Sequence, residues 1–342
     1  MKISTHKVAP ISTSTIKCFF YIANQMTLQF NCPACKSALS ENNADALSCS
    51  NCQKSFPVIN GIPILIDDEH SVFSVADYIG NQLNSAKPKS PGGIKFTLLK
   101  TIHFLQKIAP SVTLNLKARS NYKKFAELLF KKSATPRVLV IGGRTIGEGM
   151  EDLLKLPITF VATDVAFGPE AKVMCDAHSL PFQDNYFDGV IIQAVLEYLV
   201  DPYQCAAEIH RVLKDDMPLY SETPFIQQVH GAGHDFTRFT HLGHRRVFRH
   251  FEEIDSGACV GTGSALGLSY KYFILSFSNS KIVREFLLLF SYYTGFLFKY
   301  FDVFTINTSS TLDAASGYYF LGTKSNKTLT DRELVKQYRG MI

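Results

Sequence analysis

The stretch VLVIGGRTIGEG, residues 138–149, decides how the largest part of this chain folds. Its leading apolar residues predict a strand that is covered on both faces, as in a parallel sheet. The glycines that follow predict a turn whose backbone can approach a bound ligand closely. Strand-like and helix-like runs alternate from Arg137 onward, and this alternation predicts an α/β fold with a doubly covered sheet.

Two acidic residues follow the glycine-rich turn at the ends of predicted strands. The run ITFVATD ends in Asp164, and Asp176 stands after the next short apolar run. Parallel strands end at one edge of a sheet, where a carboxylate can accept hydrogen bonds from the ribose of a nucleotide-like ligand. If Asp164 stood alone, a solvated acid at a strand end would be the simpler interpretation.

The order of the motifs between residues 138 and 260 resembles class I S-adenosylmethionine-dependent methyltransferases. The matching motifs are Asp176-Ala177, Leu180-Pro181-Phe182, Phe187-Asp188, GVII (189–192), VLEYL (195–199), Asp201-Pro202 and EIHRVLK (208–214). This resemblance implies a doubly wound, mostly parallel seven-stranded sheet, methyltransferase activity and S-adenosyl-L-methionine (SAM) as the cofactor.

The resemblance also implies where the cofactor binds. It places the glycine turn at the methionine end, the first acid at the ribose, and the second acid with the following alanine at the adenine edge. A helix that starts after the turn would offer free amides to the methionine carboxylate. The residues assigned in this way are Gly142, Gly143, Gly147, Asp164, Asp176 and Ala177.

The opening stretch departs from the family pattern at two positions. Val140 stands where the family carries an acid, and Arg144 stands where it carries a second glycine. Arginine can follow the turn with its backbone while its long stem carries the charge into solvent, so we expect SAM binding to persist. The alternative is a loop that has lost its cofactor, which would make the chain a non-catalytic binding or activator protein.

Two Cys-x-x-Cys pairs, CPAC and CSNC, lie close together before this domain. Each pair can form a tight knuckle whose thiolates point at one ion, and two knuckles complete the tetrahedral sulfur shell that zinc favours. Four thiolates leave no open coordination position, so we expect a structural zinc. The predicted ligands are Cys32, Cys35, Cys49 and Cys52.

The segment FPVINGIPILI follows the second cysteine pair and predicts a hairpin around Asn60-Gly61. Residues 28–66 resemble the small zinc-ribbon family that activates tRNA and protein methyltransferases. That resemblance implies a module that contacts a partner or presents a substrate. The other four cysteines are scattered without the spacing of disulfide bridges, which fits a reducing cytoplasm; they are Cys18, Cys175, Cys205 and Cys259.

These patterns divide the chain into five parts: a loose tail (1–26), a zinc ribbon (27–67), a linker with helices near 96–108 and 121–130 (68–135), the methyltransferase domain (136–326) and a second tail (327–342). Met26 is an alternative translation start. A helical insertion at about 264–304 could cap the cleft, add to the core or face a membrane. Its most apolar run, 286–298, is too short to span a bilayer.

The segment after the predicted strand LYSETPF is rich in histidine and arginine. In an open α/β fold this segment follows a strand at the edge where ligands bind. Its stretch HGAGHDFTRFT (230–240) resembles methyltransferases of cell-surface glycan biosynthesis. His230 and His234 are candidate general bases for a hydroxyl acceptor. A metal site formed by both with Asp235, or simple bracing of the loop, are the alternatives.

The arginines of the same segment bear on the charge of the acceptor. Arg238 lies in the loop itself, so we expect it to bind an anion, whereas Arg245, Arg246 and Arg249 are expected on a solvated helix face. The net charge of +5 permits RNA as a partner without favouring it. We therefore expect a cytoplasmic SAM-dependent methyltransferase that acts on a glycan, a lipid-linked sugar or a small metabolite, with peripheral membrane contact. An RNA methyltransferase is the alternative enzyme.

Overall fold

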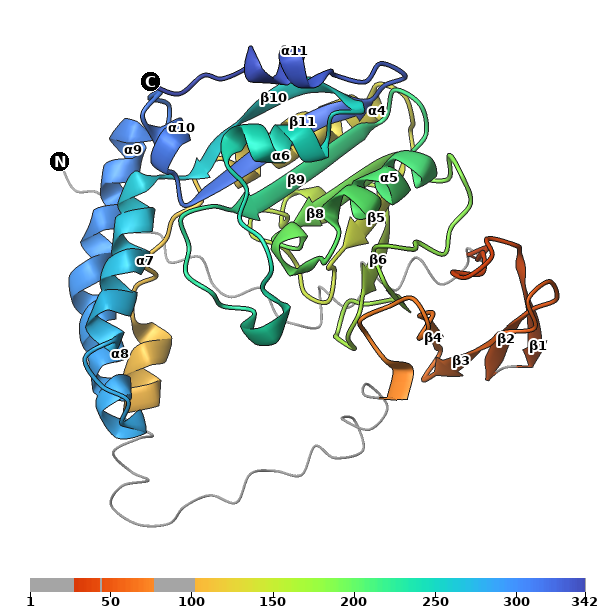
Figure 1. The fold of residues 1–342 in the computed structure, drawn as a ribbon, viewed down its shortest axis with the longest axis horizontal. Helices are drawn as coiled ribbons and strands as arrows, with labels where there is room; N and C mark the ends of the chain where they lie inside the picture. Colours follow the sequence, from red (N-terminus) through yellow and green to blue (C-terminus); the bar gives the residue numbers. More distant parts are fainter. Residues whose placement is uncertain (1–27, 44, 77–101, 342) are drawn as a thin grey trace.

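The computed structural model of the chain describes residues 28–43, 45–76 and 102–341 (Figure 1). The expected N-terminal tail, Met26 and Cys18 lie outside the described residues, as does most of the helix expected near 96–108. Residues 102–108, the part of that helix that is described, are helical.

One sheet of eleven strands runs through the described part of the chain, in the order β1-β2-β3-β4-β7-β6-β5-β8-β9-β11-β10 (Figure 1). The ribbon supplies β1 (Leu39–Asn43), β2 (Ala46–Cys49), β3 (Ser55–Ile59) and β4 (Ile62–Leu65). The main domain supplies β5 (Arg137–Ile141), β6 (Thr159–Asp164), β7 (Val173–Cys175), β8 (Gly189–Gln193), β9 (Pro218–Pro224), β10 (Phe251–Val260) and β11 (Gly317–Lys324). The strands β7, β6, β5, β8 and β9, neighbours in that order, run parallel to one another. Strand β11 lies between β9 and β10 and pairs antiparallel with both.

The expectation of a seven-stranded sheet is wrong for the sheet as a whole. Strands β5 to β11 form the part that the sequence predicts, and the four ribbon strands extend it beyond β7. Strand β4 pairs in parallel with β7 through Ile64 with Met174 and Leu65 with Cys175. An edge strand presents unpaired N–H and C=O groups, and β7 satisfies these groups with the last strand of the ribbon.

The ribbon hairpin confirms the turn that the sequence predicts. Strands β3 and β4 pair through Val58 with Pro63 and Ile59 with Ile62. Between them, Asn60 has φ 54° and Gly61 has φ 76°. Two successive residues with positive φ are the requirement of the tight hairpin turn that Asn-Gly favours.

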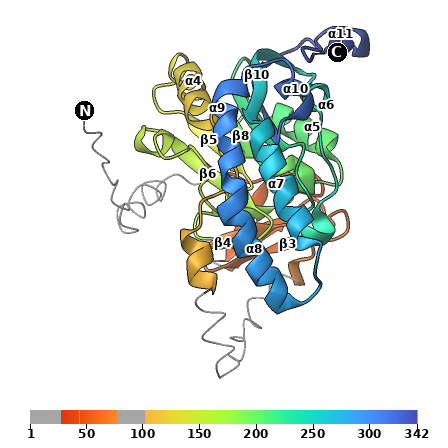
Figure 2. The same cartoon turned by 90° about the vertical axis from the view of Figure 1, so that its left-hand side faces the viewer.

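Helices cover both faces of the sheet, with α4 on one face and α5 and α6 on the other (Figures 1 and 2). The α-helices are α4 (Ala118–Phe130), α5 (Pro202–Val212), α6 (His241–Val247), α7 (Thr262–Leu275), α8 (Lys281–Gly295), α9 (Asp302–Thr305), α10 (Thr311–Ala314) and α11 (Asp331–Val335). The 3-10 helices are η2 (Leu153–Lys155), η3 (Leu196–Tyr198), η4 (Ala232–His234) and η5 (Phe296–Phe301). Helix α4 confirms the helix predicted near 121–130.

Local sequence explains where α5 starts. The Asp201 carboxylate accepts hydrogen bonds of 3.0 Å from the backbone N–H groups of Tyr203 and Gln204. Pro202 occupies the first helical position, where no intrahelical N–H bond is lost.

The residues Leu180 and Phe182 are fully buried, and the Phe182 ring packs edge-on against Phe187. Both residues therefore belong to the core.

The connection from β5 to β6 differs from the expectation. Between residues 142 and 158 the backbone forms turns and the 3-10 helix η2, and no α-helix follows the glycine turn in this described segment. Gly149 has φ 89°, and a Cβ atom there would lie 2.8 Å from the Cβ of Ala118. The connection therefore packs against the first turn of α4 instead of starting a helix of its own.

The helical insertion stands at the end of the sheet opposite the ribbon (Figures 1 and 2). Helices α7 and α8 approach closely at two glycines, because a Cβ atom on Gly267 would lie 3.2 Å from the Gly295 carbonyl oxygen. The last part of the expected helical insertion, after Gly295, is the 3-10 helix η5 followed by the short helix α9. In the ranges that the structure describes, no helix combines the length and apolar character needed to cross a membrane.

The first turn of α7 is capped by a residue that is distant in sequence. Asp302 is fully buried, and its carboxylate accepts hydrogen bonds from the backbone N–H of Gly263 (2.7 Å) and of Ser264 (3.1 Å).

We expect Asp302→Ala to lower the free energy of unfolding by about 1–3 kcal/mol, because both buried N–H groups lose their acceptor. Urea denaturation measures this loss. Asp302→Asn keeps one acceptor oxygen and should lose less; equal stability of the Ala variant and the unmodified chain would contradict the cap.

Two histidines of α6 are buried and should make the stability depend on pH. Burial lowers the pKa of His241 to about 4 and that of His244 to about 3. In the unfolded chain both take up a proton near pH 6.5, so the folded state loses stability as the pH falls below that value. We expect a loss of about 1.4 kcal/mol per pH unit for each histidine between pH 6 and pH 4.5.

Denaturation at several pH values tests this dependence. His244→Gln should remove about half of the slope, whereas the exposed His234 changed to Gln should leave the slope unaltered. A slope that His244→Gln does not reduce would show that His244 is charged in the folded state.

Candidate cofactor and acceptor site

A cavity of about 560 Å³ opens where the carboxyl ends of β8 and β9 meet the glycine turn after β5. Helix α7 closes it from the insertion side with Leu268, Lys271 and Tyr272. Further lining residues include Asn115, Gly142, Gly147, Glu148, Gln193, Ala194, Glu197, Glu222, Thr223, Gln228 and His230. The cavity lies at the sheet edge where open α/β folds bind their ligands.

The glycine turn reaches this cavity because it carries no side chains at two positions. Gly142 has φ 73°, and a Cβ atom there would lie 2.2 Å from Cγ2 of Val195. At Gly147 a Cβ atom would lie 2.0 Å from Oε1 of Gln193. Gly143 lies behind the turn, where its N–H donates to the Thr163 carbonyl at 2.8 Å. The backbone of the turn is therefore the part that faces a ligand.

The two departures from the family pattern leave the turn open. Val140 is buried within β5, where an apolar side chain packs in the core. Arg144 is exposed, its stem lies against Gly168, and its side chain is not part of the cavity lining. Arg144 therefore does not fill the space beside Gly142.

Asp164 holds the glycine turn against the end of β6. Its carboxylate accepts hydrogen bonds from the backbone N–H of Arg144 (3.2 Å) and of Ala166 (2.9 Å). Burial raises the pKa of this carboxyl group above its usual value. Asp164 is close to the turn but does not line the cavity of Gly142 and Gly147.

Asp176 lies in a second, smaller cavity of about 240 Å³, between the main domain and the segment that follows the ribbon. His178 donates to its carboxylate from the ring Nδ1 (2.6 Å) and from the backbone N–H (2.9 Å), and Ser71 donates its hydroxyl. Burial favours the neutral carboxyl, but these hydrogen bonds outweigh it and hold the pKa of Asp176 below its usual value. Ala177 beside it is buried. The carboxylate expected at the adenine edge therefore has partners within the protein.

The two candidate bases lie in different surroundings. His230 lines the larger cavity, with its Nε2 3.9 Å from the Glu197 carboxylate and its Nδ1 3.8 Å from that of Asp235. The Glu197 carboxylate raises the pKa of His230. His234 does not line this cavity; it is exposed, and its ring stacks on Phe73 at 5.5 Å. The turn η4 separates the two rings, so the described residues form no metal cluster from His230, His234 and Asp235.

The expectation that Arg238 binds an anion is not met in this structure. Its guanidinium forms two hydrogen bonds with the Asp235 carboxylate and donates to the carbonyls of Gln227 and Gln228. The guanidinium holds the pKa of Asp235 well below its usual range. A guanidinium with these partners fixes the loop over the cavity instead of offering a free charge.

The expectation of a solvated arginine face holds for Arg246, which is exposed, and is wrong for Arg245; Arg249 is half-buried just after the end of α6. Arg245 is buried and donates to the carbonyls of Phe248 (2.7 Å) and Phe251 (2.9 Å). Arg249 donates to the Leu329 carbonyl at 2.8 Å and pairs with Asp331 at 3.0 Å, and Arg246 donates to Tyr203 at 2.9 Å. These contacts tie the C-terminal segment and α5 to α6.

Buried carboxylates are the site residues that the sequence did not single out. Glu222 near the end of β9 accepts hydrogen bonds of 2.9 Å from Asn115 and Gln193 and one from Tyr220, and burial raises its pKa. Glu197 is fully buried, and neither of its carboxylate oxygens has a hydrogen-bond partner within the described chain. An acid inside the apolar runs LYSETPF and VLEYL was the available signal, because such runs predict buried positions.

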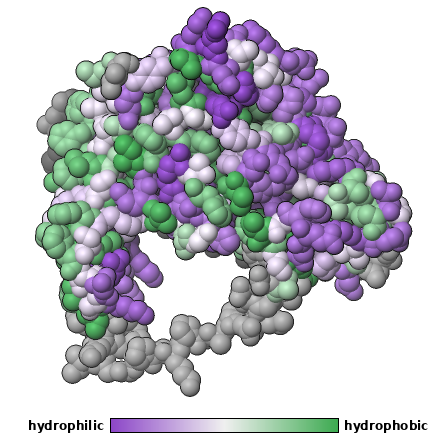
Figure 3. Space-filling view, viewed as in Figure 1, coloured by the Kyte–Doolittle hydropathy of each residue, from purple (hydrophilic) through white to green (hydrophobic). Residues whose placement is uncertain are grey.

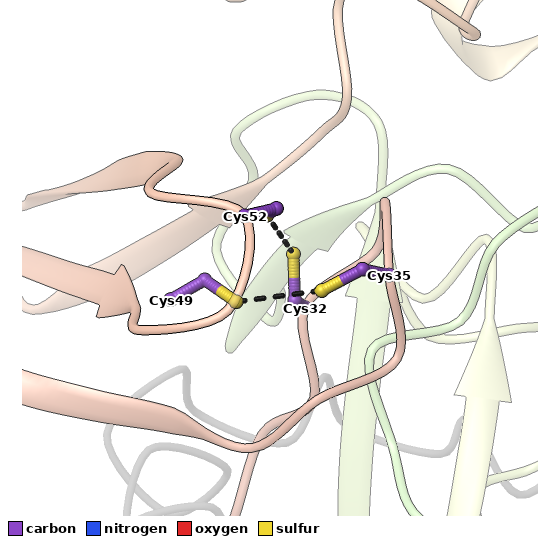
Figure 4. Close-up of side chains that lie close together, drawn as sticks. All are labelled: Cys32, Cys35, Cys49 and Cys52. Atoms are coloured by element: carbon purple, nitrogen blue, oxygen red, sulfur yellow. Dashed lines mark hydrogen bonds between the residues drawn. The ribbon is translucent and has the colours of Figure 1, made fainter.

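The four predicted zinc ligands lie together in the ribbon (Figure 4). Their sulfur atoms are all within 4.8 Å of one another; Sγ of Cys32 is 3.6 Å from that of Cys52, and Sγ of Cys35 is 3.4 Å from that of Cys49. The edge of a tetrahedron with metal–sulfur bonds of about 2.3 Å is about 3.8 Å, so this arrangement fits one zinc ion. In the second cluster of potential metal ligands, Asp67 and Glu69 already bind the Lys54 ammonium, and the His70 ring contacts Asp67 at 2.8 Å.

The ribbon contacts the main domain beside Asp176. Lys36 donates to the Ser179 hydroxyl at 2.8 Å and to the Glu208 carboxylate at 2.9 Å. The Asn31 N–H donates to the Pro181 carbonyl at 3.0 Å, and the Ser179 hydroxyl donates to the Pro33 carbonyl at 2.6 Å. The first cysteine knuckle therefore rests directly on the segment between Asp176 and Phe182.

Comparison with known proteins gives one family match and several remote structural similarities. Residues 153–219 match the family described as a methyltransferase domain. This segment runs from η2 to the start of β9 and does not include the glycine turn. Among curated proteins, none shows significant sequence similarity to this chain.

Solved structures with a similar arrangement include several methyltransferases and a [4+2]-cyclase. They include 1,6-didemethyltoxoflavin-N1-methyltransferase of Burkholderia thailandensis (12% identity, TM-score 0.36, 83% of this chain and 100% of that chain). Phosphoethanolamine N-methyltransferase 2 of Haemonchus contortus matches at 14% identity and a TM-score of 0.40, over 60% of this chain and 53% of that chain. Geranyl diphosphate C-methyltransferase of Streptomyces coelicolor A3(2) matches at 11% identity and a TM-score of 0.37, over 60% and 75%.

Similarities at this level carry nothing about an acceptor, and the acceptors of those enzymes differ from one another. The family match rests on the segment that places Asp176, the buried Phe182 and the cavity residue Glu197 around the sheet edge. The family match over residues 153–219 supports a methyltransferase enzyme.

Proposed function

We propose that this chain is a SAM-dependent methyltransferase that binds the cofactor across the carboxyl ends of β5, β6 and β7. The observation that carries the proposal is that the backbone of Gly142 and Gly147 opens into the same cavity as Glu197, Glu222 and His230. Asp164, Asp176 and Ala177 lie along the neighbouring strand ends, in the order expected for ribose and adenine. The family match over the adjoining segment supports the same activity.

When bound, SAM supplies an activated methyl group on a sulfonium, and the protein needs to align the acceptor and exclude water. The cavity provides a partly enclosed space for that alignment. His230 and Glu197 form the pair that could take a proton from the acceptor, since both line the cavity and lie 3.9 Å apart. Asp235 and Arg238 position His230 by fixing its loop.

The charge of the lining bears on the acceptor. Three acidic residues line the cavity, Glu148, Glu197 and Glu222, together with one lysine, Lys271. Burial lowers the pKa of Lys271. This balance disfavours the anionic acceptor that the arginines in the sequence indicate. We therefore propose a neutral or cationic acceptor group, such as a hydroxyl or amine of a glycan, a lipid-linked sugar or a small metabolite.

We further propose that Cys32, Cys35, Cys49 and Cys52 hold one structural zinc. The fit of the four sulfur atoms to a tetrahedron supports this proposal. A closed sulfur shell stabilises a ribbon that has few buried apolar residues of its own. Because the knuckle rests on Ser179 and Pro181, the metal also stabilises the wall of the smaller cavity.

Calorimetry with SAM tests the cofactor proposal. Gly142→Ala should weaken binding at least tenfold, about 1.4 kcal/mol, because the new Cβ atom would meet Val195 and the turn requires positive φ. Gly233→Ala is the matched control, since a Cβ atom there meets nothing within 4 Å. Thermal melting confirms that each variant is folded. If the unmodified chain shows no binding at millimolar SAM, the methyltransferase proposal fails.

Metal analysis of the full chain tests the zinc proposal. Protein purified without added zinc should carry one zinc ion per chain, and Cys49→Ser should lose most of it because three thiolates leave the shell open. Cys259→Ser, at a buried cysteine remote from the ribbon, should keep the metal. Stoichiometric zinc in the Cys49→Ser variant would disprove the assignment.

A further inference from the structure

The segment from α8 to α9 carries a row of large apolar side chains on the outside of the molecule. Its members recur at helical spacing of three or four residues, so they form one stripe along the helix axis. Phe290 is 52% exposed and Phe304 is 82% exposed. The residues of this stripe, called the apolar stripe below, are Ile282, Phe286, Phe290, Tyr293, Leu297, Phe301 and Phe304.

The apolar stripe is not the face by which α8 joins the protein. The fully buried residues of α8 are small, Ser291 and Gly295, and Gly295 meets α7 at Gly267, while Leu287, Leu288 and Tyr292 are half-buried. A helix whose fully buried residues are small and whose exposed residues are large and apolar reverses the usual pattern of a globular domain. A contiguous exposed apolar surface of this kind marks a site of protein or membrane contact.

Neighbouring elements extend the apolar stripe into a broader surface. Phe273 and Phe277 near the end of α7 are 59% and 69% exposed, and Phe104 and Ile108 lie on the helix at 102–108. That helix runs beside α8, because Gln106 donates to the Glu285 carboxylate at 2.8 Å. Figure 1 shows α7 and α8 at one side of the molecule, and Figure 3, in the same orientation, shows apolar residues along that edge.

The charges around the apolar stripe fit an anionic surface. The segment from Lys281 to Thr305 contains the acids Glu285 and Asp302; Asp302 is buried in the cap of α7, and Glu285 accepts a hydrogen bond from Gln106. The exposed lysines of these helices are Lys281 at the start of α8 and Lys107 on the helix at 102–108, whereas Arg284 donates to the Leu275 carbonyl and Lys299 is buried. Aromatic side chains with flanking basic residues are the composition of protein surfaces that lie in the headgroup region of a bilayer.

We propose that the apolar stripe docks this protein on the surface of a membrane that contains anionic lipids. The described helices are too short or too polar to cross the bilayer, so the contact is interfacial. The opposite side of the same helical layer faces the cavity, since Leu268, Lys271 and Tyr272 of α7 line it. Docking by the apolar stripe therefore leaves one helical layer between the cavity and the lipid surface, where an acceptor with an apolar anchor would be held.

Flotation of the full chain with vesicles tests this proposal. Vesicles of phosphatidylcholine with about one third phosphatidylglycerol should carry the protein to the top of a density gradient. Phe290→Ser combined with Phe304→Ser should reduce the bound fraction at least tenfold, because the deepest-inserting rings are lost without a change in charge. Val335→Ser is the matched control, since Val335 is 70% exposed on α11, away from the apolar stripe. It should float like the unmodified chain.

Each other outcome overturns the proposal. Equal flotation of the double variant would show that charge alone binds the vesicles. No flotation of the unmodified chain would exclude the membrane, and a dimer that the double variant dissociates would assign the apolar stripe to a second copy instead. Calorimetry with SAM on the same double variant should give the affinity of the unmodified chain. It separates loss of docking from failure of the cofactor proposal, because the apolar stripe lies outside the cavity.

Discussion

The parallel pairing of β5 with β6 on one side and with β8 on the other is the constraint on which the rest of the site depends. It brings the carboxyl ends of these strands to one edge, so the glycine turn, Asp164 and Gln193 meet there although they are far apart in sequence. At that edge Gly142 contacts Val195 so closely that a side chain does not fit. The geometry of the cavity follows from this edge of the sheet, because Glu197 lies in the segment after β8 and His230 in the segment after β9.

The N-terminal ribbon that carries the four cysteines is built into the same sheet through β4 and β7. Strand β4 leads to Asp67, which pairs with Lys54 of the ribbon, and then to Ser71, which donates to Asp176. A short stretch of chain and one hydrogen bond, from the Ser71 hydroxyl, therefore connect the cysteine knuckles to the carboxylate expected at the adenine edge. Phe73 continues this segment onto His234, which explains why that histidine is held away from the larger cavity. The ribbon thus forms part of the wall of the site as well as an added strand set.

Charge in the larger cavity is distributed in an unusual way for a buried space. Burying a carboxylate is costly unless it is paired or hydrogen-bonded. Glu222 meets this requirement through Asn115, Gln193 and Tyr220, whereas Glu197 has no hydrogen-bond partner within the described chain and has only the His230 ring nearby, at 3.9 Å. Glu197 thus leaves carboxylate oxygens without hydrogen bonds at the place where an acceptor would bind. It also raises the pKa of the neighbouring His230. Arg238, by contrast, is fully used by Asp235.

The sequence by itself determined the local features of this protein. The spacing of the cysteines predicted their cluster, Asn60-Gly61 its hairpin turn, Asp201-Pro202 the start of α5, and the apolar run before Gly142 the strand β5. These features depend on backbone propensities and hydrogen bonds between near neighbours, which a short stretch of sequence specifies.

Only the tertiary structure decided which distant groups meet. It extended the sheet to eleven strands, replaced the helix expected after the glycine turn with turns that pack on α4, and divided His230 from His234. It also buried Arg245 and used Arg238 within its loop, while Glu197 and Glu222 came together in the cavity. The physical reason is that burial and pairing depend on contacts between segments far apart in the chain, and residue type alone does not reveal those contacts.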